Sequence, residues 1–300
     1  MIRAIGPYHL VRRLGRGGMA EVHLAIAHGA SGFERRVAIK LLAPELAGEH
    51  ELERALIREA TLAATLHHRN LVAVLGLGVH EGSYYVVMEH VDGGDLAHHL
   101  DGPIPEPLAL HIVHELALGL GYLHAATDTH GLPLGIVHRD VGPANTLVST
   151  TGDVKLGDFG IAKATALADL TAAGARKGRY AYMAPEQLAG EPVTAAADQF
   201  GLAVTLVELV TGARPFAGAD ETTPWALLEA IRHGPRFDTA DRGVLAPDLA
   251  AIAARALAFD PAARFASIEE LRRAIAATQA SRPRITALDL GAFVRRNTHG

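Results

Sequence analysis

Two short apolar runs in the middle of the chain limit its possible folds more than any other part of the sequence. The first is Ile136-Val-His-Arg-Asp140-Val-Gly-Pro-Ala-Asn145-Thr-Leu-Val148, and the second, Val154-Lys-Leu-Gly-Asp158-Phe-Gly160, follows after a short turn. Each run has the length of a buried strand, and a hairpin would bring Asp140, Asn145 and Asp158 together. A single aspartate at a strand end is most often a turn or cap residue. Three such groups favour another use, in which one carboxylate positions a hydroxyl group while the asparagine and second carboxylate hold a divalent cation over a phosphate.

Composition excludes several classes of protein. The 300 residues are enough to bury a large core, as one two-lobed unit or as two domains. Hydrophobic residues make up 49% of the chain, charged residues 20%, and the net charge is −5. We therefore expect a globular protein without the basic surface of a nucleic-acid-binding protein. The absence of cysteine removes disulfides, thiolate metal sites and a cysteine nucleophile.

The sequence shows no signal for export or membrane insertion. The N-terminus has too little apolar content for a signal peptide. No run of about 18 residues is free of charge and histidine, so we expect no membrane span in this chain. The most apolar candidate, residues 108–123, contains His111, His114 and Glu115, which favours a buried amphipathic helix. We expect a cytoplasmic protein.

The N-terminal part alternates polar and apolar residues as strands do. The pattern predicts a small antiparallel sheet of five strands with one helix, over residues 8–14, 21–27, 35–42, 71–78 and 83–90 for the strands and 44–66 for the helix.

After residues 91–94 the periodicity becomes helical. Helices are expected over residues 105–126, 194–211, 222–233, 247–259 and 268–278. We therefore place an N-terminal lobe at 8–91 and a C-terminal lobe at 95–278. Residues 281–300 form either a linker or a short docked segment.

A glycine-rich segment, Gly15-Arg-Gly-Gly18-Met-Ala-Glu-Val22, joins the first two expected strands. Glycine lets a backbone approach phosphate oxygens closely and present its N–H groups. A glycine-rich hairpin turn is also common without any ligand.

Lys40 lies in an otherwise apolar strand, Val37-Ala-Ile-Lys40. Lysine occurs only at positions 40, 155, 163 and 177, so this one is not a background residue. One interpretation is an edge-strand lysine that reaches solvent. The other is an ion pair with Glu59 on a facing helix, which would hold the ammonium group against nucleotide phosphates.

Three further charged residues lie in the helical part. Glu186, in Met183-Ala-Pro-Glu186, and Asp198 are by themselves ordinary acids near helix starts. Arg264 follows later in the chain and offers Glu186 a buried bidentate partner.

Taken in order, these motifs resemble the signature set of protein kinases, from the glycine-rich loop to the Ala-Pro-Glu segment. The resemblance runs from about Tyr8 to Thr278. It is strongest to the bacterial eukaryotic-like (Hanks-type) serine/threonine kinases, through Gly-Gly-Met-Ala-Glu-Val-His-Leu-Ala and Tyr-Met-Ala-Pro-Glu-Gln. The implied fold is α+β and two-lobed, with a small antiparallel N-terminal sheet, one helix there, and a mainly helical C-terminal lobe. ATP and magnesium are expected in the cleft between the lobes.

The resemblance also implies which residues bind ATP. They come from the glycine-rich loop, the strands beside it and the connection between lobes: Leu14, Gly15, Arg16, Gly17, Gly18, Met19, Ala20, Glu21, Val22, Ala38, Lys40, Met88, Glu89, Val91 and Asp95. The three loop glycines would cover the phosphates, and Lys40, held by Glu59, would contact the α and β phosphates.

The remaining ATP contacts follow the same resemblance. Val22 and Ala38 would line the adenine, and Met88 would be the gatekeeper. Glu89 and Val91 would offer backbone hydrogen bonds to the base. Asp95 would face the ribose or a basic substrate residue.

For the reaction itself, the resemblance assigns three groups and a supporting hydrophobic column. Asp140 would accept or orient the proton of the substrate hydroxyl, and Asn145 and Asp158 would hold two magnesium ions. Phe159 and His138 would stack in a hydrophobic column anchored by Asp198.

Arg139 precedes the catalytic aspartate, which in the family marks kinases whose activation loop is ordered by a bound phosphate. Between Asp158 and Glu186 the aliphatic hydroxyls are Thr165 and Thr171. We expect Thr171 to be the phosphorylated residue, with Thr165 second. Autophosphorylation in trans would imply transient self-association.

The chain departs from the family at one contacting pair. The family carries a lysine two residues after the catalytic aspartate, and this chain has Gly142 at that position. The activation-segment threonine that this lysine contacts in the family is replaced here by Arg179. We interpret this as a relocated positive charge, so that Arg179 reaches the γ phosphate. The alternative is that Arg179 pairs with Asp140 and lowers the activity of the enzyme.

We therefore predict an ATP-dependent kinase that phosphorylates serine or threonine of proteins, including its own activation loop. Tyrosine is less expected because Val141-Gly-Pro-Ala144 does not match the tyrosine kinase pattern. One alternative is a nucleotide-binding pseudokinase that acts as a signalling scaffold. A small-molecule phosphotransferase is a weaker alternative, since the Ala-Pro-Glu segment is typical of a protein-substrate platform.

Overall fold

The structure is a computed structural model that describes residues 4–17, 20–43, 46, 49–99, 102–158, 180–218, 223–237 and 244–297. Its contacts divide it into two compact units. Among the described residues, the first unit comprises residues up to 68 together with 72–90, and the second comprises 69–71, 91–158 and 180–297.

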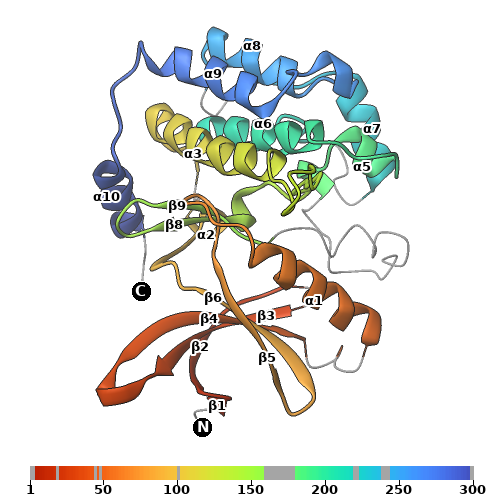
Figure 1. The fold of residues 1–300 in the computed structure, drawn as a ribbon. Coiled ribbons are helices and arrows are strands. Elements are labelled where there is room, and N and C mark those ends of the chain that lie inside the picture. Colours follow the sequence, from red (N-terminus) through yellow and green to blue (C-terminus); the bar gives the residue numbers. More distant parts are fainter. Residues whose placement is uncertain are drawn as a thin grey trace. The chain divides into compact units, whose positions relative to one another are not determined.

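The first unit contains a six-stranded antiparallel sheet with the strand order β1-β2-β3-β4-β6-β5 (Figure 1). The strands are β1 (Ala4–Ile5), β2 (Tyr8–Arg16), β3 (Ala20–His28), β4 (Glu34–Leu42), β5 (Val74–His80) and β6 (Ser83–Glu89). Five of them were predicted. The sixth, β1, has two residues, too few to show an alternating pattern.

Helix α1 (His50–Ala63) packs on one face of this sheet. Leu56 and Ala60 of α1 meet Val86, whereas Tyr85 and Val87 point into a second apolar cluster on the other face. This division follows from the two-residue period of a strand. The helix was predicted from residue 44 and begins at residue 50, while Pro44 itself lies outside the described residues.

The second unit is mainly helical. Its helices are α2 (Leu96–His99), α3 (Glu106–His124), α5 (Pro185–Leu188), α6 (Ala196–Thr211), α7 (Pro224–Arg232), α8 (Pro247–Ala256), α9 (Ile268–Gln279) and α10 (Ala287–Asn297). Helix α6 is buried along almost its whole length, and α3 packs against both α6 and α9. Within the described ranges, no helix combines the length and apolar character that crossing a membrane requires.

A three-stranded antiparallel sheet in the second unit carries the two central apolar runs. Its strands are β7 (Gly93–Asp95), β8 (Thr146–Ser149) and β9 (Val154–Leu156), in that order. Val148 pairs with Val154, so the predicted hairpin is present.

The C-terminal segment is docked. Residues 287–297 form α10, which packs beside β8 (Figure 1).

Candidate active site

In the first unit, Lys40 and Glu59 form the ion pair that the sequence predicted. Lys40 lies on β4, paired with Val22 of β3 and Val86 of β6, and Glu59 projects from α1. The Lys40 Nζ atom is 3.1 Å from Glu59 Oε1, and the two side chains are only 14% and 13% exposed. Such shielding strengthens a charge-assisted hydrogen bond and restricts the rotamers of the lysine. The ammonium group is thus held in one place.

The glycine-rich segment is the turn of the β2–β3 hairpin. Gly15 pairs with Val22, and the Gly17 N–H donates to the Ala20 carbonyl at 2.8 Å. A Cβ added at Gly15 would meet no described atom within 4 Å, so a ligand has room to approach this backbone. Gly18 and Met19 lie outside the described residues.

Glu21, one residue after this turn, lies beside two arginines and a histidine. Arg13 and Arg16 lie 3.4 and 3.5 Å from its carboxylate, and His23 Nε2 lies at 3.1 Å. These contacts join the two hairpin strands at the base of the loop. The neighbouring Leu14 is partly buried on β2.

Ala38 and Met88, the residues expected at the adenine, are direct partners across β4 and β6. Ala38 is buried. One residue further along β6, the Glu89 N–H donates to the Ala73 carbonyl at 2.9 Å, and the Glu89 carboxylate accepts from the Ala73 N–H at 2.7 Å. These two bonds fix the end of β6.

In the second unit, a buried carboxylate fixes the segment that precedes Asp140. Asp198 accepts hydrogen bonds from the backbone N–H of His138 at 2.9 Å and of Arg139 at 2.7 Å. The His124 Nε2 atom lies 2.7 Å from the same carboxylate. Arg139 has a φ of +68°, a left-handed conformation that costs energy in a non-glycine residue. The bonds to Asp198 hold it there.

Asp140 and Asn145 contact each other directly. The Asn145 Nδ2 atom donates to Asp140 Oδ2 and to the Asp140 carbonyl, both at 2.7 Å. The Asn145 carbonyl accepts from Gly157 N–H at 2.9 Å, one residue before Asp158. The backbone next to Asp158 is therefore bonded to Asn145, which in turn contacts Asp140.

The side-chain oxygens of Asn145 and Asp158 fit a magnesium ion that binds together with a nucleotide. Because Asn145 uses its amide nitrogen on Asp140, its side-chain oxygen is the atom a cation would bind. Asp158 adds a carboxylate. Among the described residues, no cluster of three or more histidine, aspartate or glutamate side chains could hold a metal by itself. Magnesium commonly takes only one or two protein carboxylates and completes its shell with phosphate and water.

Asp95, at the end of β7, bonds the first turn of α2. Its carboxylate accepts from the backbone N–H of His98 at 3.0 Å and lies 2.7 Å from the His98 ring nitrogen Nδ1. The carboxylate is still partly exposed, at 24%. Val91, just before β7, is partly buried.

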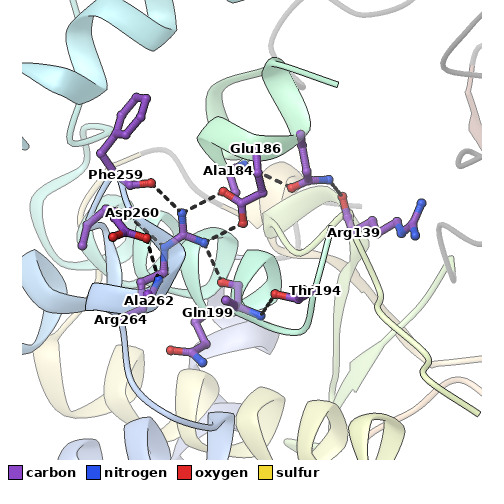
Figure 2. Close-up of polar contacts among 12 residues, drawn as sticks. Arg139, Ala184, Glu186, Thr194, Gln199, Phe259, Asp260, Ala262 and Arg264 are labelled. Atoms are coloured by element: carbon purple, nitrogen blue, oxygen red, sulfur yellow. Dashed lines mark hydrogen bonds and ion pairs between the residues drawn. The ribbon is translucent and has the colours of Figure 1, made fainter. Parts of the chain in front are cut away.

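Glu186 and Arg264 form the bidentate pair that the sequence predicted (Figure 2). Both N–O distances are 2.8 Å, and the side chains are 4% and 0% exposed. On the same short helix, Gln187 Nε2 donates to the Arg139 carbonyl at 2.9 Å. Helix α5 is therefore tied both to Arg264 and to the residue before Asp140.

Two of these contacts were missed in the sequence. Gln187 lies within the Tyr-Met-Ala-Pro-Glu-Gln motif, but no role was assigned to it. His124 is the last residue of the apolar helix α3. The only hint of its contact in the sequence is that a polar residue ends an apolar helix.

Gly142 faces an aromatic ring. A Cβ on this residue would lie 3.3 Å from Tyr182 Cγ. The Tyr182 hydroxyl donates to Glu208, and burial raises the pKa of the Tyr182 hydroxyl far above its ordinary value.

Besides Gly18 and Met19, four more predicted residues cannot be placed against this arrangement. Phe159, Thr165, Thr171 and Arg179 lie outside the described residues.

The protein kinase domain family matches residues 8–274 of the chain. The chain belongs to this family. The kinase domain is 40% identical to "Tyrosine-protein kinase MasK" of Myxococcus xanthus, over 92% of this chain and 43% of that protein. It is 36% identical to "Serine/threonine-protein kinase PknB" of Mycobacterium leprae, also over 92% of this chain and 43% of that protein. The chain thus spans less than half the length of these relatives.

Solved structures agree with the fold. The crystal structure of the Mycobacterium tuberculosis PknI kinase domain matches with a TM-score of 0.64 and 31% identity, over 93% of this chain and 98% of that one. The predicted two-lobed protein kinase fold, with an antiparallel N-terminal sheet and a helical C-terminal part, is confirmed.

Proposed function

We propose that this chain transfers the γ phosphate of ATP to serine or threonine hydroxyls of proteins, its own activation loop included. The observation that carries the proposal is the Asp140–Asn145 contact on a segment that Asp198 holds in place. A carboxylate fixed in this way can receive a proton from a substrate hydroxyl, and the asparagine beside it can take part in holding a cation.

Each group has one task in the proposed reaction. Lys40, restrained by Glu59, binds the α and β phosphates, and the backbone of Gly15 and Gly17 covers them. As Asp140 accepts the proton of the acceptor hydroxyl, the oxygen of that hydroxyl forms a bond to the γ phosphorus. The bond between the γ phosphorus and the β–γ bridging oxygen breaks, and ADP leaves. Magnesium bound by Asn145 and Asp158 would neutralise phosphate charge.

The other proposed ATP contacts surround the base and ribose. We assign this lining to the strands next to Lys40 and to the segment after β6: Leu14, Val22, Ala38, Met88, Glu89, Val91 and Asp95. Ala38 and Met88 support this assignment because they are paired across adjacent strands.

Arg179 is proposed to supply the positive charge that Gly142 lacks. Arg179→Ala should then lower the rate on the order of 100-fold, because the transition state spreads negative charge over the transferring phosphoryl group. The double variant Gly142→Lys with Arg179→Thr should keep activity, provided that the Tyr182 ring yields a few tenths of an ångström to the new side chain. An Arg179→Ala variant faster than the parent would contradict the proposal.

The acceptor residue has a second candidate. The relative at 40% identity is named a tyrosine kinase, whereas the relative at 36% is named a serine/threonine kinase. This chain also has Gly142 at the position where serine/threonine kinases carry a lysine. Phosphoamino-acid analysis decides between the two: we expect phosphothreonine and phosphoserine, and phosphotyrosine alone would contradict the proposed specificity.

Mixing two forms of the chain tests the proposal and its trans mechanism. The parent is incubated with ATP, magnesium and a tagged Asp140→Asn chain, and phosphate on the tagged chain is mapped. We expect phosphate at Thr171 first and Thr165 second, which requires transient self-association of two copies. The Asp140→Asn chain alone should gain none. ATP supply makes the cytoplasm the proposed location.

A further inference from the structure

Helix α10 lies after residue 274, where the match to the kinase family ends, and docks on the turn between β8 and β9 (Figure 1). Leu290 and Val294 of this helix are fully buried, and the Arg295 guanidinium donates to the Thr150 carbonyl of the turn. The helix start is capped by Thr286, whose hydroxyl and backbone N–H both donate to Asp289, at 2.6 and 2.9 Å.

Two glycines make this contact unusually close. A Cβ on Gly291 would lie 2.6 Å from the Thr150 carbonyl oxygen, and a Cβ on Gly152 would lie 1.7 Å from the Ala287 carbonyl oxygen. The helix and the turn therefore meet backbone to backbone, a separation that a larger residue at position 291 does not permit.

The same turn is joined to the start of β7. The Thr150 N–H donates to the Asp92 carbonyl at 2.7 Å, and Gly93 pairs with Ser149. Helix α10 thus holds one end of the β7-β8-β9 sheet. At this end the turn joins β8 to β9, and the first residue of β7 lies beside it.

The opposite end of this sheet carries the proposed site. Asp95 ends β7, Asn145 immediately precedes β8, and Asp158 follows β9 by two residues. The antiparallel register puts these three at one end, since Asp95 pairs with Leu147 and Thr146 pairs with Leu156.

We propose that α10 is a positioning element for nucleotide and metal binding: by holding the far end of the three-stranded sheet, it fixes the strand ends that present Asp95, Asn145 and Asp158. The assignment of those three residues rests on the proposed function, whereas the mechanical link does not. A change in α10 docking is then a route by which the C-terminal segment alters nucleotide affinity.

Gly291→Leu tests the link, because it forces α10 away from Thr150 without touching the site. Arg296→Leu is the matched control, since it places the same side chain at an exposed position of the same helix. A second variant of the same 300-residue chain, Leu290→Asp with Val294→Asp, releases α10 by burying charge if Gly291→Leu does not.

The first readout is hydrogen exchange on the nucleotide-free chain. We expect exchange on the order of tenfold faster at residues 146–157 in whichever variant releases α10, with α6 unchanged and the control like the parent. The second readout is the Kd of a magnesium complex of a non-hydrolysable ATP analogue, which should weaken by a similar factor.

Released α10 with unchanged exchange at 146–157 and an unchanged Kd would overturn the proposal. If the parent itself does not bind the analogue, the proposed function fails, and the exchange readout still decides whether α10 holds the sheet.

Discussion

Replacing Arg264 with leucine should destabilise the second unit strongly. The substitution leaves the Glu186 carboxylate, 4% exposed, without its cation. It also removes donors from the carbonyls of Ala196 and Ala258, each 3.0 Å from the guanidinium in the parent. Removing one partner of a buried ion pair costs about 3–5 kcal/mol, mostly because the other charge stays buried.

For a chain of this size, that loss corresponds to a fall in Tm of roughly 10 °C. The assay is thermal unfolding followed by circular dichroism, with Arg273→Leu as the control. Arg273 also pairs with a glutamate, Glu269, at 3.0 Å, but its side chain is 72% exposed. Its loss should cost less than about 1 kcal/mol.

The double variant Glu186→Leu with Arg264→Leu sharpens the test. It buries no charge, so it should be less destabilised than the sum of the two single variants. If Arg264→Leu melts at the temperature of the Arg273→Leu control, the reasoning about the buried pair is refuted.

Three further outcomes are expected. Lys40→Met should lower kcat/KM for ATP on the order of 100-fold in a steady-state kinase assay; full activity would contradict its role. Burial lowers the pKa of His111 and of His114 below 6.5, so the unfolded chain binds protons that the folded chain does not, and stability should fall as the pH drops below about 6.5. Urea unfolding at a series of pH values checks this, and substituting both histidines with glutamine should flatten the slope. Tyr182→Phe removes the donor to Glu208 and should cost about 1–2 kcal/mol in the same urea assay; an unchanged midpoint would argue against that bond.

Much of the site was predictable because each charge in an apolar setting requires a partner. Lys40 in an apolar strand required an acid, and Glu59 was the facing candidate; Glu186 and Arg264 lie 78 residues apart but satisfy the same rule. The Asp140, Asn145 and Asp158 hairpin followed from two apolar runs and the turn between them.

What escaped prediction depends on packing rather than on local pattern. Strand β1 is too short to alternate, and α10 is a short helix whose stability comes from the turn against which it docks. The approach of Gly291 to Thr150 has no signature in either segment alone. His124 contacts Asp198 across 74 residues, and a histidine at a helix end has many other uses.

Intact-protein mass spectrometry tests phosphotransfer most directly. The dephosphorylated parent and the Asp140→Asn variant are incubated separately with ATP and magnesium, and their masses are followed with time. The proposal predicts mass gains in whole phosphate units for the parent and none for the variant. An unchanged parent mass, with nucleotide binding still detectable by thermal shift, would contradict it and favour the pseudokinase alternative.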